Sequence, residues 1–74
     1  MKIQLKITNK ELQILSLISQ EFTTSEIAVK MKLASKTVEN HRYNIAKKLN
    51  LTGNNCVLIF ALAHKSELIK RNAR

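Results

Sequence analysis

Polar side chains at helical spacing are the part of this sequence best suited to chemistry with another molecule. They recur at intervals of three or four positions: Lys36, Asn40, Tyr43 and Lys47, with Glu39 beside them. On a helix, residues at such intervals lie on one face. Lysine ammonium groups attract phosphate, whereas amide and carboxylate groups can hydrogen-bond to base edges in a major groove. The spacing therefore predicts a helix face that binds duplex nucleic acid.

No residues suited to catalysis or to metal binding can be assembled from the rest of the sequence. Cys56 is the single cysteine, and the two histidines, His41 and His64, match no zinc-ligand spacing with it. All five acidic residues are glutamate, so a Ser-His-Asp triad lacks its aspartate. We therefore expect no enzyme, cofactor, metal or small-molecule ligand. His41 is expected to be a core or hinge residue.

The charge and length of the chain predict one basic domain, spanning residues 1–74. Thirteen Lys and Arg against five acids give a net charge of +8, which favours a polyanionic partner. A chain of 74 residues buries a modest core, so oligomerisation is the expected additional source of stability. The longest apolar run, 56–63, is too short to cross a membrane, and no signal peptide precedes it. We expect a cytoplasmic protein.

Four helices are predicted to position these residues, and two of them begin with capping signals. Thr8 with Glu11, and Thr23 with Glu26, have the S/T-x-x-E spacing of a capping box. Ala34 stands where the third helix needs a cap, so we expect that helix to be capped late or poorly. The predicted helices span about 8–20, 24–31 and 35–49, with a fourth that starts at Asn54 or Asn55 and runs to about 70.

A tight turn without Gly or Pro separates the second and third predicted helices. Leu33 is expected to plug this turn at 32–34, and the small Ala28 lets the two helices approach closely. Val38 and Ile45 fall on the inward face of the third helix. A short helix, a tight turn and a longer helix with a basic outer face describe a helix-turn-helix, whose second helix enters a major groove.

The fourth predicted helix is apolar on every side in its first half. A surface helix needs only one apolar stripe, so a second side of this helix must also be covered. Either a second copy of the chain covers it, or the helix is the central core helix of the domain. We predict a homodimer interface here, formed by Cys56, Val57, Ile59, Phe60 and Ala63.

Three stretches of the chain, residues 7–15, 25–31 and 36–49, resemble motifs of the LuxR/GerE-type helix-turn-helix family. Residues 7–15 are similar to its opening L-T-x-R-E-x-E-V-L, and residues 25–31 to x-K-E-I-A-x-x-L. Residues 36–49 are similar to K-T-V-x-x-H-x-x-x-I-x-x-K-L. The resemblance covers about residues 7–63, the expected core. It implies an all-α, four-helix domain of a bacterial transcription regulator, with a third helix for recognition and a fourth for dimerisation. Asn50 stands where the family has a helix-ending glycine.

The resemblance also assigns roles by position. It implies contacts to DNA bases by Glu39, Asn40 and Tyr43. It implies phosphate contacts by Thr24, Ser25, Lys36, Thr37 and Lys47, and the positive charge of Arg42 adds this residue to them. Lys48 lies beside the same face and adds to its positive charge, and two or three of the four cations Lys36, Arg42, Lys47 and Lys48 are expected to meet phosphate. The expected partner is double-stranded DNA in the bacterial nucleoid. The alternative is a basic protein-interaction or oligomerisation module that binds no specific DNA sequence.

Overall fold

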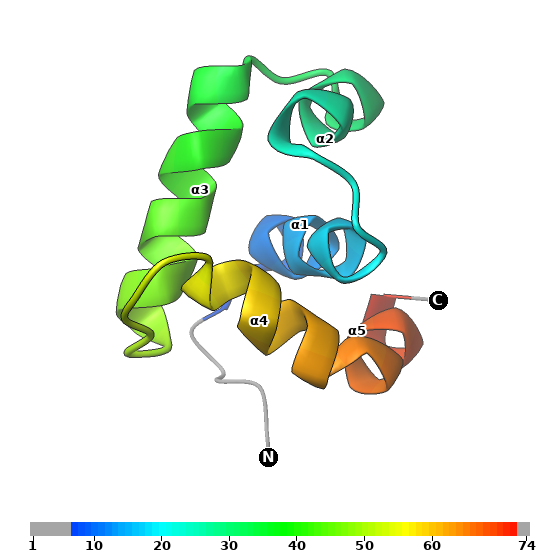
Figure 1. Cartoon of the computed structure of the whole chain (residues 1–74). Coiled ribbons are helices and arrows are strands. Elements are labelled where there is room, and N and C mark those ends of the chain that lie inside the picture. Colours follow the sequence, from blue (N-terminus) through cyan, green and yellow to red (C-terminus); the bar gives the residue numbers. More distant parts are fainter. Residues whose placement is uncertain (1–6, 73–74) are drawn as a thin grey trace.

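Five helices make up residues 7–72, the part of the chain that the computed structural model describes (Figure 1). They are α1 (Asn9–Ser19), α2 (Thr24–Met31), α3 (Ser35–Lys48), α4 (Cys56–Ala63) and α5 (Lys65–Asn72). Within residues 7–72 there is no strand, and the predicted all-α class is confirmed. The bounds of the first three helices agree with the predicted ones to within one residue at each end.

The starts of α1 and α2 are fixed by the two predicted capping boxes. The Thr8 hydroxyl accepts from the Glu11 N–H at 3.1 Å, and the Thr8 N–H donates to the Glu11 carboxylate at 3.0 Å. Thr23 and Glu26 repeat this exchange at 3.1 and 2.8 Å. The start of α3 is different, because Ala34 at its N-cap position provides no side-chain hydrogen bond. The poor cap predicted for this helix is confirmed.

The turns after α2 and α3 each use a residue other than glycine in the left-handed conformation. Lys32 ends α2 at φ 58°, and its N–H donates to the carbonyls of Ala28 and Val29. The Leu33 N–H then donates to the same Ala28 carbonyl at 2.9 Å, which closes the turn. Asn50 follows α3 at φ 57°, as expected of a residue that tolerates this conformation. The predicted tight turn is therefore confirmed.

The core is built around α1, which contacts every other helix. Its fully buried side chains, Ile14, Leu15 and Ile18, meet the inward faces of α2 and α3 on one side and of α4 and α5 on the other. Burial of one such side chain is worth about 1.5–3 kcal/mol. The other buried apolar residues are Ile27, Ala28, Val38, Ile45, Leu49, Val57, Phe60, Ala61 and Leu68. α3 is thereby held with one face inward.

The prediction of a single fourth helix from residue 54 or 55 to about residue 70 is wrong, because two helices, α4 and α5, occupy this stretch. The helical path breaks at His64, at φ −116° and ψ 25°, where the N–H donates to the carbonyls of Phe60 and Ala61. α5 then lies along α1 and buries Leu68 completely, so the core extends beyond residue 63. Asn55 takes the N-cap position of α4, without a side-chain cap.

Candidate nucleic-acid interface

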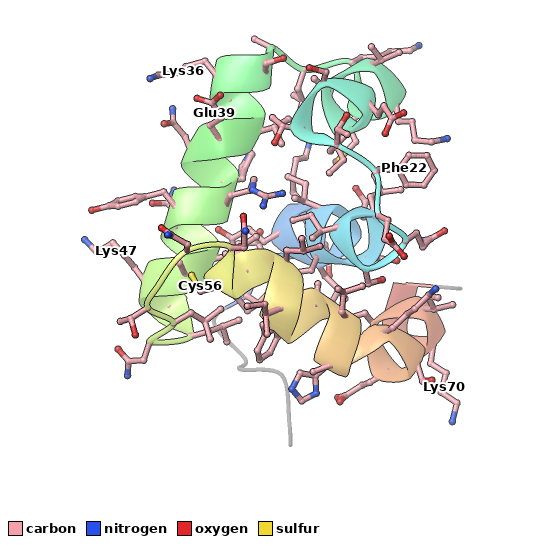
Figure 2. All side chains as sticks on the ribbon, viewed as in Figure 1. Phe22, Lys36, Glu39, Lys47, Cys56 and Lys70 are labelled. Atoms are coloured by element: carbon pink, nitrogen blue, oxygen red, sulfur yellow. The ribbon has the colours of Figure 1, made fainter. Side chains whose placement is uncertain are left out.

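α3 divides its side chains between the core and solvent. Val38 and Ile45 are fully buried, whereas Tyr43 on the opposite side is 64% exposed. Figure 2 shows Lys36 and Lys47 projecting from the side of α3 that faces away from the other helices, with Glu39 between them along the helix. We call this surface the outer face of α3. It consists of the exposed residues Lys36, Glu39, Asn40, Tyr43 and Lys47.

The two lysines stand near opposite ends of the outer face of α3. Lys36 and Lys47 are eleven positions apart, which corresponds to about 16 Å along a helix. A major groove is about 12 Å wide and is bordered by the phosphates of both strands. Lysines at this separation can therefore reach phosphates on either side of a groove that α3 occupies.

Tyr43 and Lys47 are in contact on this face. The Lys47 ammonium lies 5.5 Å from the centroid of the Tyr43 ring, within the range of a cation–π interaction. The two residues are one helical turn apart, so the contact needs no bend in α3. It holds a positive charge beside the aromatic ring on the surface of the helix.

The residues expected to contact phosphate occupy two places. Lys36 and Lys47 lie on the outer face of α3, and the half-buried Thr37 lies in the first turn of that helix. Thr24 and Ser25 open α2 instead. Arg42 is half-buried and lines a surface groove together with Thr24 and Leu58. The structure therefore brings Arg42 to the start of α2 rather than to the outer face of α3.

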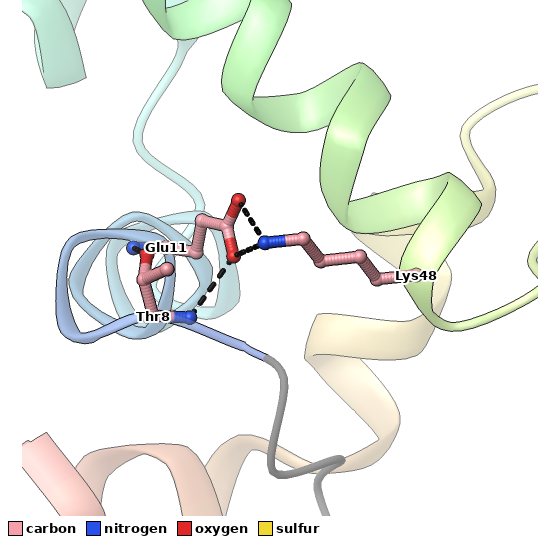
Figure 3. A network of polar contacts seen from close by, with 3 residues as sticks. All are labelled: Thr8, Glu11 and Lys48. Carbon is pink, nitrogen blue, oxygen red and sulfur yellow. Dashed lines mark hydrogen bonds and ion pairs between the residues drawn. The ribbon is translucent and has the colours of Figure 1, made fainter.

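Lys48 is not free to bind phosphate, because its ammonium is bound to Glu11 of α1 (Figure 3). The Lys48 nitrogen lies 2.8 and 3.0 Å from the two Glu11 oxygens, one of which also accepts the Thr8 N–H. Burial would raise the pKa of Glu11, but the hydrogen bonds from Lys48 and Thr8 and the charge of Lys48 hold it below its ordinary value. The expectation that Lys48 adds charge beside the recognition face is therefore wrong.

α4 has an inner and an outer side of similar hydrophobicity. Val57 and Phe60 are 6% and 7% exposed and belong to the core of the domain itself. Ile59, at 61% exposed, and Leu62, at 43%, point outward. Leu62 was not among the predicted interface residues, although its i+3 spacing from Ile59 is visible in the sequence. We define the outer face of α4 as Cys56, Ile59, Leu62 and Ala63.

The remaining candidate chemistry gives no further site. Among the described residues, no group of three or more His, Cys, Asp and Glu side chains is placed to hold a metal ion. None of the helices described has the length and apolar character needed to cross a membrane. His41 is half-buried on the inward side of α3, and the His64 ring packs on Phe60 at a centroid distance of 4.4 Å.

Comparison with known proteins agrees with the geometry of α2 and α3. A family model described as bacterial regulatory proteins of the luxR family matches residues 5–61. The chain is 50% identical over 46 residues to the uncharacterized response regulatory protein YgeK of Escherichia coli K12, which is 62% of this chain and 31% of YgeK. It is 39% identical over 59 residues to the oxygen regulatory protein NreC of Staphylococcus carnosus, which is 80% of this chain and 27% of NreC.

A third relative is closer in length to this chain. The spore germination protein GerE of Bacillus subtilis is 38% identical over 47 residues, which is 64% of each protein. No solved structure matches the chain significantly. The matched stretch of this chain spans less than a third of the length of YgeK and NreC and about two thirds of that of GerE.

The short α2, the tight turn and the exposed polar face of α3 define a helix-turn-helix DNA-binding domain of the kind found in transcription regulators. The chain belongs to the luxR family of bacterial regulatory proteins, because the family model covers more than half of its residues. This is a family of DNA-binding regulators rather than of enzymes.

Proposed function

We propose that this domain binds double-stranded DNA in a sequence-specific manner and acts as a transcription regulator, or as the DNA-binding part of one. The outer face of α3 enters the major groove. The observation that carries this proposal is the arrangement of that face, where two lysines flank a stretch of side chains able to contact bases. Such a domain acts on the bacterial chromosome in the cytoplasm.

Base edges are contacted by three residues between the lysines. The Asn40 amide suits the paired donor and acceptor of adenine, and the Glu39 carboxylate suits an amino group. The Tyr43 ring suits apolar contact with a thymine methyl group. The phosphate contacts are Thr24, Ser25, Lys36, Thr37, Arg42 and Lys47. Hydroxyl groups and backbone N–H groups in the first turns of α2 and α3 supplement the cationic side chains.

The domain works as a homodimer through the outer face of α4. The support for this is that the face is apolar along its length, with Ile59 the most exposed of its large side chains. A two-fold dimer would present two copies of α3 to successive major grooves, so half-sites would lie about one helical turn apart. Each copy contributes one outer face of α3, which contacts one half-site.

The salt dependence of duplex binding tests this function. Three cationic contacts per domain, from Lys36, Arg42 and Lys47, predict that log K falls against log salt with a slope of about −3 per domain. Fluorescence anisotropy with a labelled duplex between about 50 and 200 mM salt measures it. An affinity that barely changes over this range would contradict the proposal. It would favour the alternative of a protein-interaction module.

A further inference from the structure

Glu39 is the one acidic residue on the outer face of α3. Glu11 and Glu26 accept hydrogen bonds in the capping boxes, and Glu11 also binds Lys48. The Glu39 side chain is exposed and, among the residues described, no hydrogen bond or ion pair engages its carboxylate. No contact within the described residues therefore fixes the Glu39 carboxylate, which lies where the groove would be read.

A carboxylate at this position opposes DNA binding in general. Duplex DNA carries one negative charge per roughly 1.7 Å of its axis, and α3 would bring Glu39 between two rows of phosphates. Each nearby phosphate repels the carboxylate, and the repulsion is stronger where protein excludes water. The carboxylate also loses its hydration. The repulsion and the loss of hydration both arise whatever the sequence of the DNA.

Only some base edges can offset these costs. The major-groove edges of guanine and the O4 of thymine present acceptors, which repel a carboxylate. Adenine presents an amino group next to the N7 acceptor, so attraction and repulsion occur side by side. Cytosine carries no acceptor of its own on this edge, so only the O6 of the paired guanine lies beside its N4 amino group, whereas the adenine amino group lies between N7 and the O4 of the paired thymine. Cytosine is therefore the base that best satisfies Glu39.

We propose that Glu39 is the main specificity-determining residue of the outer face of α3, selecting a cytosine at one position of each half-site and weakening binding to all other sequences. This inference rests on the proposed function. The carboxylate has two effects on binding, repulsion from all DNA and attraction to one base, and an affinity for a single duplex combines them. Removal of the carboxylate strengthens binding to unrelated DNA and weakens binding to the selected site.

Selection of duplexes from a random pool tests the inference, using the wild type, Glu39→Ala and Glu39→Gln. The wild type should enrich a cytosine at one position, Glu39→Ala should lose the preference at that position alone, and Glu39→Gln should replace cytosine by adenine, which a glutamine amide pairs bidentately. Glu21→Gln is the matched control. This substitution removes the same charge from an exposed residue of the α1–α2 connection, and the variant should retain the preference for cytosine at that position.

Direct binding to two duplexes provides the second readout. Glu39→Ala should bind a scrambled duplex severalfold more tightly than the wild type does, and the selected duplex about tenfold or more weakly, as expected for one lost base contact. An unchanged base preference in Glu39→Ala would overturn the inference and leave the proposed function intact. If the wild type itself enriches no sequence and binds duplexes without salt dependence, the proposed function fails, and the inference fails with it.

Discussion

Glu11 serves two purposes at the scale of single residues. Its carboxylate closes the capping box of α1 and also binds Lys48, near the end of α3 (Figure 3). It is 4% exposed, so its charge depends on these partners. The capping box could be predicted because it joins residues three positions apart. The pairing with Lys48 could not, because 37 positions separate the two residues and only the packing of α3 on α1 brings them together.

The stability of the domain should fall in acid because of Glu11. The pKa of this carboxyl is lowered by folding, so its contribution is complete above the pKa of the unfolded chain and is lost as pH falls through the folded pKa. Urea unfolding at pH 7 should show Glu11→Gln to be less stable than the wild type by about 1–3 kcal/mol. The difference should shrink as pH is lowered from about 5 towards 3.

Glu21→Gln is the control for this prediction, because Glu21 is exposed and outside both capping boxes. Its stability should match the wild type to within about 0.5 kcal/mol at each pH. A Glu11→Gln variant that is as stable as the wild type at pH 7, or less stable by an amount that pH does not change, would show that the ion pair contributes nothing.

At the scale of elements, the starts of helices could be read from the sequence, but the break between α4 and α5 could not. Caps and turns depend on neighbouring residues, so the beginnings of α1 and α2 and the turn at Lys32 were predictable. The stretch around His64 contains neither Gly nor Pro. The break becomes understandable only from the packing of α5 on α1, which buries Leu68.

The two sides of α4 were also not distinguishable from the sequence. An all-apolar helix carries no periodicity to indicate which side faces inward, so sequence alone does not separate Val57 and Phe60 from the surface residues around them. The inward side is fixed by contact with α1 and α3. What remains exposed is the outer face of α4, on which the proposed dimer depends.

A charged residue on the outer face of α4 should prevent dimerisation. Ile59→Glu would bury a carboxylate between two copies of α4, so it should weaken self-association about a hundredfold or more, as judged by sedimentation equilibrium. Val29→Glu is the matched control, because Val29 is 78% exposed on α2 and away from α4. It should associate like the wild type. Equal association of both variants would place the interface elsewhere.

At the scale of the whole molecule, the exposed lysines include two groups on opposite sides of the domain. The outer face of α3 carries Lys36 and Lys47, whereas Lys70 of α5 projects from the far side of the domain (Figure 2). α1 lies between the two sides (Figure 1). Net charge alone predicted a polyanionic partner but not the side that would meet it. The burial of Val38 and Ile45 determines which side this is, because it leaves the polar residues of the outer face of α3 exposed to solvent.

Charge reversal on these two sides tests most directly whether the outer face of α3 binds DNA. Lys36→Glu with Lys47→Glu is compared with Lys65→Glu with Lys70→Glu, an equal charge change at exposed positions of α5. Titration of a labelled duplex at fixed salt should show about a hundredfold or greater loss for the α3 pair and only a few-fold loss for the α5 pair. Equal losses in the two double variants, or wild-type binding by the α3 pair, would contradict the account.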